Sequence, residues 1–283
     1  MEMEKSKAYN PRTDVLRRLW GNKTAMVGLF VFLVVCVACI FAPWVTKWNY
    51  YSINTHAARE SPSFQHLLGT DQLGRDMFAR LLYGGRVTLR VAFQSSVLAA
   101  ILGSIIGVLS GYFGKRVDTF FSHILDMVAA IPVFLLVIVC ETALGWGKGN
   151  FLYAMAIGAV PQFARLVRAS VMSIMGNEYI EAAQALGISH LGIMTRHIFH
   201  NAAPSVIVRF TSAVTEAVLI CTILGYLGIG VNPPMPEWGA IAYMGRTYIR
   251  TTPRLMVFPC AMITICVISL SLFGDDQGSG FRI

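Results

Sequence analysis

Ionisable residues inside or at the edge of apolar stretches need an explanation first, and three of them are candidates for a polar pathway. These three are Glu141, Arg209 and Glu216. Because a charged side chain in hydrocarbon is costly, such residues line polar pathways or pair with one another. Arg209 and Glu216 are two helical turns apart and therefore share one face of a helix. A pathway lining and structural pairing explain Glu216 equally well, whereas structural pairing or contact with the membrane interface better explains Arg209 and Glu141.

The motifs of common enzymes are absent from the sequence. There is no G-x-x-x-x-G-K-[ST] loop for phosphates, no H-E-x-x-H and no G-x-S-x-G. His197 and His200 have H-x-x-H spacing, and Cys36 and Cys39 have C-x-x-C spacing, but neither pair has further ligands nearby. The sequence therefore predicts a protein that is not an enzyme and that binds no metal or cofactor itself.

The candidate pathway residues Glu141, Arg209 and Glu216 lie in or next to long apolar stretches, which must form the elements that position them. The chain is 55% hydrophobic and only 13% charged, against about 25% charged residues in soluble domains. Each stretch is long enough to cross a hydrocarbon core of about 30 Å as a helix. The sequence thus predicts an all-α integral membrane protein with six transmembrane helices, at residues 25–45, 88–112, 120–143, 151–172, 204–230 and 255–273.

The distribution of charge predicts how these spans are oriented. Residues 1–24 carry six basic residues before the first span, and basic flanks are retained in the cytoplasm. An even number of spans then leaves both termini in the cytoplasm. The predicted membrane domain covers residues 25–273, with an outer segment at about 46–87, a cytoplasmic loop at about 173–203 and a cytoplasmic tail at 274–283. The net charge of +8 needs no nucleic acid partner.

Two features of the spans predict how they pack. Small residues recur every fourth position in the second span, and such a stripe lets two helices approach closely in lipid. Pro132 and Pro161 lie inside the third and fourth spans and predict kinks there. The small residues are Ala99, Gly103, Gly107 and Gly111.

The cytoplasmic loop reads as two helices joined by a turn. Asn177 suits the N-cap of the first helix and Gly187 suits its left-handed end. Ser189 suits the N-cap of the second helix, and Pro204 suits the first position of the fifth span. An amphipathic helix of this kind fits a groove on a partner protein. Its apolar stripe consists of Tyr179, Ile180, Ala183 and Leu186.

This loop resembles the EAA loop of binding-protein-dependent ABC importer permeases. The matching residues are Glu181, Ala182, Ala183, Gly187 and His197. The resemblance implies the type I permease fold, in which the loop is a coupling helix that docks into an ATPase subunit. It also implies that Glu178 and Tyr179, next to the motif, belong to the docking surface.

A second motif narrows the resemblance. Residues 66–76 (HLLGTDQLGRD) and 224–242 are similar to segments in the second permease subunit of dipeptide, oligopeptide and nickel importers. The glycines and short polar side chains also suit turns tied by side-chain-to-backbone hydrogen bonds. The C-terminus departs from that branch, because QGSGFRI follows Gly274, Asp275 and Asp276. The outer motif residues are Gly69, Thr70, Asp71, Gly74, Arg75 and Asp76.

The resemblance implies a set of partners and a location. They are a homologous second permease subunit forming a heterodimer, two cytoplasmic ATPase subunits that hold ATP and Mg, an extracytoplasmic substrate-binding protein and the lipid bilayer. The location is the cytoplasmic (inner) membrane of a bacterium or archaeon. The implied substrates are di- and oligopeptides, with nickel or a metal chelate as the alternative. A stand-alone secondary transporter is the alternative of another class, but it would need internal repeats that the sequence lacks.

Overall fold

The computed structural model describes residues 22–144, 150–231 and 234–279, and in these ranges the chain is helical. The only β pairing in these ranges is an isolated bridge between Thr70 and Asp76. Residues 1–21, with most of the basic residues before the first span, and residues 145–149, 232–233 and 280–283 lie outside the described ranges. The elements are α2 (Lys23–Ile40), α3 (Ala42–Val45), η1 (Thr55–Ala57), α4 (Met77–Phe113), α5 (Lys115–Ala129), α6 (Val133–Leu144), α7 (Asn150–Met175), α8 (Glu178–Ala185), α9 (His190–Gly192), η2 (Ile193–Ile198), α10 (Phe199–Tyr226), α11 (Trp238–Gly245), η3 (Arg246–Tyr248) and α12 (Arg254–Ser279).

The helices that are long and apolar enough to cross a membrane number four in the described ranges, or five if the bent pair α5–α6 is one span. They are α2, α4, the continuous helix His190–Tyr226 and the helix Arg254–Gly274. The predicted fourth span is present as α7 but is not among them, because Gln162, Arg165 and Arg168 interrupt its apolar run. One face of α7 is instead buried against other helices of the chain.

The predicted third span is not one straight helix. It is divided into α5 and α6, which meet at an angle of 83°. Pro132 lies in the break between them and α6 begins directly after it. Proline disfavours the helical conformation in the residue before it and suits the start of a helix, so the break falls at this position. The kink expected at Pro132 is therefore a sharp corner.

The predicted fifth span also begins earlier than expected. Pro204 lies inside α10, and α9, η2 and α10 form one continuous helix from His190 to Tyr226. The loop at about 173–203, predicted to be cytoplasmic, is thus continuous with a helix long enough to span a membrane. The first part of this helix, η2, is a π-helical segment, in which hydrogen bonds span five residues instead of four.

The small-residue stripe of α4 packs against α7, as the sequence predicts, and this is the most extensive helix pair of the chain. A Cβ atom added at Gly103 would lie 2.4 Å from the Cβ of Phe163, and one at Gly107 would lie 2.6 Å from the carbonyl oxygen of Ala164. Only glycine allows the two backbones to approach this closely.

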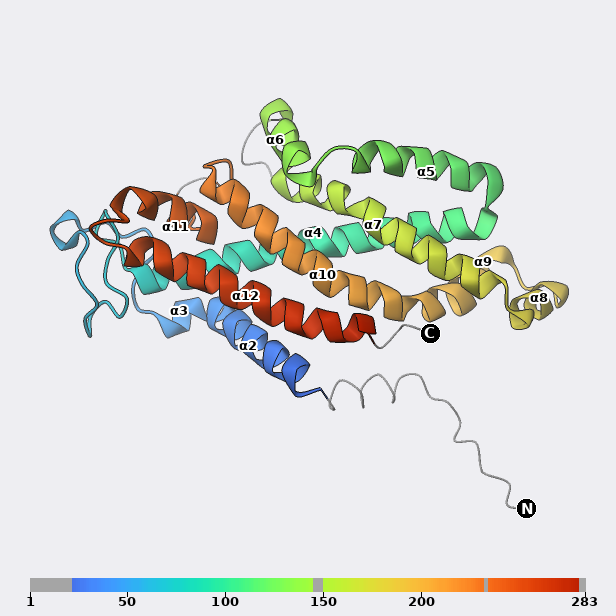
Figure 1. Cartoon of the computed structure of the whole chain (residues 1–283), viewed down its shortest axis with the longest axis horizontal. Coiled ribbons are helices and arrows are strands. Elements are labelled where there is room, and N and C mark those ends of the chain that lie inside the picture. Colours follow the sequence, from blue (N-terminus) through green and yellow to red (C-terminus); the bar gives the residue numbers. More distant parts are fainter. Residues whose placement is uncertain (1–21, 145–149, 232–233, 280–283) are drawn as a thin grey trace, which may run out of the picture.

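The bundle is elongated, and the two predicted motifs lie at its opposite ends (Figure 1). The segment before α4 and the helix α11 form one end, whereas α8 and α9 project at the other. α2 and α12 run side by side along one edge. The last helix, α12, continues through Ser279, so that much of the predicted tail extends the sixth helix. Glu141 and the Arg209–Glu216 pair lie between the two ends, on α6 and α10.

Candidate functional site

The loop at about 173–203 folds as a helix, a turn and a second helix. Gly187 has a φ angle of +75°, and its N–H donates to the carbonyl of Gln184 while that of Ile188 donates to Ala183. These two bonds form a Schellman motif, which needs a left-handed residue at the position of Gly187. Ser189 caps the second helix, because its Oγ accepts from the N–H of Gly192 at 3.2 Å.

The predicted side-chain cap at Asn177 is wrong. Asn177 is the N-cap residue of α8, but its side chain accepts no hydrogen bond from the helix. Its Nδ2 donates instead to the carbonyl oxygens of Ser173 and Ile174 at 3.2 and 2.9 Å. The side chain therefore closes the end of α7, where carbonyl groups lack helical partners.

Only half of the apolar stripe of α8 remains free. Ile180 and Ala183 are buried in a cluster of this chain with residues of α7 and of the second helix. Tyr179 and Leu186 remain exposed, Leu186 at 82%. The stripe therefore has two uses: its buried half attaches α8 to the bundle, and its exposed half forms an apolar surface at the tip of the loop.

The remaining motif residues surround this surface. Glu178, Glu181 and Ala182 are exposed, and Glu181 has no hydrogen-bond or ion-pair partner among residues 22–144, 150–231 and 234–279. The His197 ring lies 6.3 Å from the ring of Tyr179, whose hydroxyl accepts from Asn201 at 3.2 Å. The structure thus brings the predicted coupling residues together at one end of the molecule.

The outer motif forms a buried polar turn before α4. The Asp71 carboxylate accepts from Nε of Arg75 at 2.7 Å and from the backbone N–H groups of Leu73 and Arg75. Nε of Arg80 lies 3.3 Å from the same carboxylate. Gly69 and Gly74 have φ angles of +76° and +72°, which agrees with the predicted turns.

The other residues of this motif attach the turn to α4. Asp76 caps the helix by accepting from the N–H of Ala79 at 2.7 Å, and it also contacts Nδ1 of His66 at 2.8 Å. The hydroxyl of Thr70 donates to the carbonyl of Ala57. All polar groups of the motif are used within the chain, so the geometry assigns it a scaffolding role.

A second buried polar group, Glu237, was not selected by sequence reasoning. Its carboxylate caps α11 through the N–H groups of Gly239 and Ala240, both at 2.9 Å, and accepts from the Thr88 hydroxyl of α4 at 3.1 Å. Burial raises the pKa of Glu237, although these hydrogen bonds act in the opposite direction. The signal in the sequence was its place directly before the apolar run of α11, which is typical of an N-cap.

Arg209 and Glu216 share one face of α10, as their spacing predicts, and they form an ion pair with each other. Nη1 and Nη2 of Arg209 donate to the two carboxylate oxygens of Glu216 at 3.1 and 2.9 Å. The Arg209 guanidinium also lies over the ring of Phe163, 5.8 Å from its centroid. The Arg209 side chain is 16% exposed and that of Glu216 is 48% exposed. Two parallel hydrogen bonds make this a strong pair.

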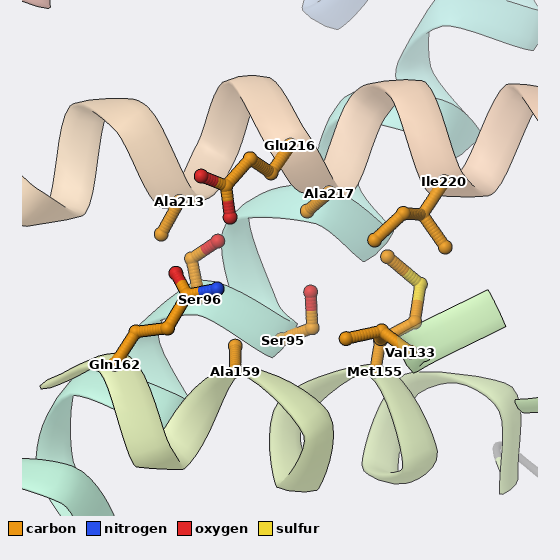
Figure 2. A pocket seen from close by; sticks show the side chains of 10 residues that line it. All are labelled: Ser95, Ser96, Val133, Met155, Ala159, Gln162, Ala213, Glu216, Ala217 and Ile220. Atoms are coloured by element: carbon orange, nitrogen blue, oxygen red, sulfur yellow. The ribbon is translucent and has the colours of Figure 1, made fainter. Parts of the chain in front are cut away.

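Glu216 also lines a small cavity of about 20 Å³ between α4, α6, α7 and α10 (Figure 2). The carboxylate of Glu216 and the side chains of Ser96 and Gln162 point into the same space. Ser96 is 1% exposed, and its hydroxyl has no hydrogen-bond partner in the described part of the chain. The apolar walls come from Val133, Met155, Ala159, Ala213, Ala217 and Ile220.

The third predicted pathway residue, Glu141, is not part of this cavity. It lies on α6, is 3% exposed, and has no hydrogen-bond partner within the described residues. The structure therefore brings together two of the three predicted residues and separates the third.

Comparison with known proteins relates the whole chain to one kind of protein. Residues 103–275 match the family described as binding-protein-dependent transport system inner membrane component. Residues 10–63 match the N-terminal transmembrane domain of oligopeptide transport permease C. The chain is 37% identical to the dipeptide transport system permease protein DppC of Alkalihalophilus pseudofirmus, over 95% of this chain and 88% of that protein.

Further similarities extend to a second relative and to the fold. The chain is 34% identical to the oligopeptide transport system permease protein OppC of Bacillus subtilis, over 93% of this chain and 86% of the relative. A solved structure of the MetNI methionine ABC transporter in an inward-facing conformation superimposes with a TM-score of 0.60. The superposition covers 73% of this chain and 98% of the solved chain, and the two sequences are 23% identical over it. The similarity is therefore one of fold.

Proposed function

The chain belongs to the family of binding-protein-dependent transport system inner membrane components, and from this we propose that it forms one half of the translocation channel of an ATP-driven peptide importer. It is a multi-pass protein of the inner membrane with the fold of an ABC importer permease. The observation that carries the proposal is its identity of 37% to a dipeptide permease along nearly the whole chain.

The partners follow from the two ends of the bundle. The exposed surface of α8, with Leu186 and Glu181, fits the groove of a cytoplasmic ATPase subunit, which would hold ATP and Mg. The rigid connection from His190 to Tyr226 would carry movement of that subunit into the membrane. A homologous permease would complete the channel, and an external binding protein would deliver the substrate.

A peptide is favoured over nickel as the substrate. The relatives compared above are described as dipeptide and oligopeptide permeases, which supports peptide import, and no residue in the described chain favours nickel. Family membership also argues against a stand-alone secondary transporter. In the proposed orientation both termini and α8 are cytoplasmic, the outer motif is external, and Glu216 lines the pathway.

The test is to co-purify the chain with a second permease and two ATPase subunits from the same genome, and to reconstitute the complex in liposomes with the cognate binding protein. ATP-dependent uptake of dialanine is expected, with none when this chain is omitted. Uptake of nickel without uptake of peptide would contradict the substrate, and peptide uptake without ATP would contradict the mechanism.

The orientation is tested separately with single cysteines at Ser63 and Asn177, both of which are exposed. An impermeant thiol reagent added outside intact cells should label the first position and leave the second unlabelled. Labelling of both from outside would contradict the proposed orientation.

A further inference from the structure

The Arg209–Glu216 pair and the cavity beside it carry an inference that rests on the proposed peptide import. We propose that they form a site for the two charged ends of a short peptide, with the α-ammonium group in the cavity at Glu216 and the terminal carboxylate at Arg209. The intrachain ion pair is then the empty form of this site, because each residue substitutes for one end of the peptide.

The cavity has the size and the polar groups that a primary ammonium requires. Its volume of about 20 Å³ holds roughly one water molecule, and an –NH₃⁺ group is of similar size. An ammonium has three donors and no acceptor. The cavity offers the Glu216 carboxylate and the Ser96 hydroxyl as acceptors (Figure 2).

The Ser96 hydroxyl is the second, independent observation. A buried polar group normally has a partner, and leaving one without a hydrogen bond costs about 1–3 kcal/mol. Ser96 is 1% exposed, has no partner in the described chain and faces the cavity. A bound ammonium group that donates a hydrogen bond to this hydroxyl would remove that cost.

Arg209 is suited to the other end of the peptide. Its guanidinium already holds a carboxylate by two parallel hydrogen bonds, at 3.1 and 2.9 Å, which is the geometry that a peptide C-terminus would require. The Phe163 ring on its other side limits contact with water. A terminal carboxylate can therefore replace Glu216 without leaving either charge unpaired.

The spacing of the two residues selects short peptides. Seven residues of α-helix separate their Cα atoms by about 10 Å along the axis. The ion pair holds the two charged groups in direct contact at 2.9–3.1 Å, so a peptide enters only when the pair opens. An extended chain spans at most about 3.3–3.6 Å per residue, and two or three residues then match the backbone separation. Peptides whose ends are blocked would lose one of the two contacts.

The first experiment exchanges the two charges. Arg209→Glu combined with Glu216→Arg keeps an ion pair but reverses its polarity, and uptake of dialanine by the reconstituted complex is measured alongside recovery of all subunits. The expected result is a complex that assembles but transports at less than about a tenth of the wild-type rate. Uptake within twofold of the wild type would mean that the pair is structural and would overturn the proposal.

The second experiment uses no charged substitution. It tests the proposed site even if the complex with the exchanged charges does not assemble. Ser96→Ala removes a hydroxyl that the described part of the fold does not use, so assembly should be normal, whereas uptake of dialanine should fall at least threefold. Ser104→Ala, a buried change on the same helix outside the cavity, is the matched control and should leave uptake unchanged. Equal uptake by the Ser96→Ala and Ser104→Ala complexes overturns the proposed site. The proposed function of peptide import is judged separately, by whether the wild-type complex takes up dialanine.

Discussion

The left-handed turn at Gly187 provides the sharpest test of how the coupling loop works. Gly187 has a φ angle of +75°, and a Cβ atom added there would meet nothing within 4 Å. A substitution therefore acts through backbone strain and not through a collision. For an ordinary L-residue, this strain is on the order of 1–2 kcal/mol, while asparagine tolerates the left-handed region well.

Backbone strain at residue 187 should weaken the binding of the ATPase subunit to the loop. If the ATPase binds only the native turn, each 1.4 kcal/mol lowers the apparent affinity about tenfold. Gly187→Ala should then weaken ATPase binding by roughly five- to thirtyfold. Gly187→Val should be worse, because a branched side chain is a stronger outlier at positive φ. Gly187→Asn is the matched control and should remain close to the wild type.

The assay is titration of the reconstituted permease pair with purified ATPase subunit, followed by the ratio of peptide imported to ATP hydrolysed in the assembled complex. The expected order of affinity is wild type, Asn, Ala and then Val. Equal affinity of the Val and Asn variants would refute the reasoning, since only the backbone conformation distinguishes them in open space.

The other predictions concern packing and pH. Gly107→Ala should destabilise the α4–α7 contact by about 1–3 kcal/mol, because the added Cβ would lie 2.6 Å from the carbonyl oxygen of Ala164. Thermal unfolding of the complex in detergent measures this loss. Gly176→Ala is the control and should not show the loss, because its Cβ would lie 3.7 Å from its nearest neighbour. Burial raises the pKa of Glu237 above its ordinary value of 4.5, so the stability that its protonation supports is fully present below that value and is lost as the pH rises through the folded-state pKa. Glu237→Gln should abolish this part of the pH dependence, and an unchanged pH profile of unfolding would contradict it.

Much of the fold follows from local patterns in the sequence. Apolar runs locate the helices because hydrocarbon demands about 20 apolar residues per span. The small-residue stripe of α4 predicts a close helix contact, and the structure places α7 there. Gly187 ends the first helix of the predicted coupling loop and Ser189 caps the second, as expected. Both roles depend on the residue type itself, because glycine adopts the left-handed conformation easily and serine has a side-chain oxygen for the cap.

The errors arose where a neighbouring segment decided the outcome. Pro204 begins a helix by local rules, yet it lies inside a continuous one, because tertiary packing outweighs the loss of one hydrogen bond. Pro132 indicated a kink, but its angle of 83° depends on where α5 and α6 pack. The Asn177 side chain could cap either α7 or α8, and only the structure shows that it closes α7.

The sequence by itself determined the class of protein, the positions of most helices and the helix–turn–helix form of the predicted coupling loop, because hydropathy and turn chemistry act over a few neighbouring residues. Tertiary structure alone decided which polar groups are used within the chain. It buried the outer motif and Glu237 among hydrogen-bond partners of this chain, whereas it left the Ser96 hydroxyl without a partner in the described chain and placed it beside Glu216. The Thr88–Glu237 hydrogen bond and the placement of Ser96 beside Glu216 each join residues more than a hundred positions apart, and no local pattern in the sequence records them.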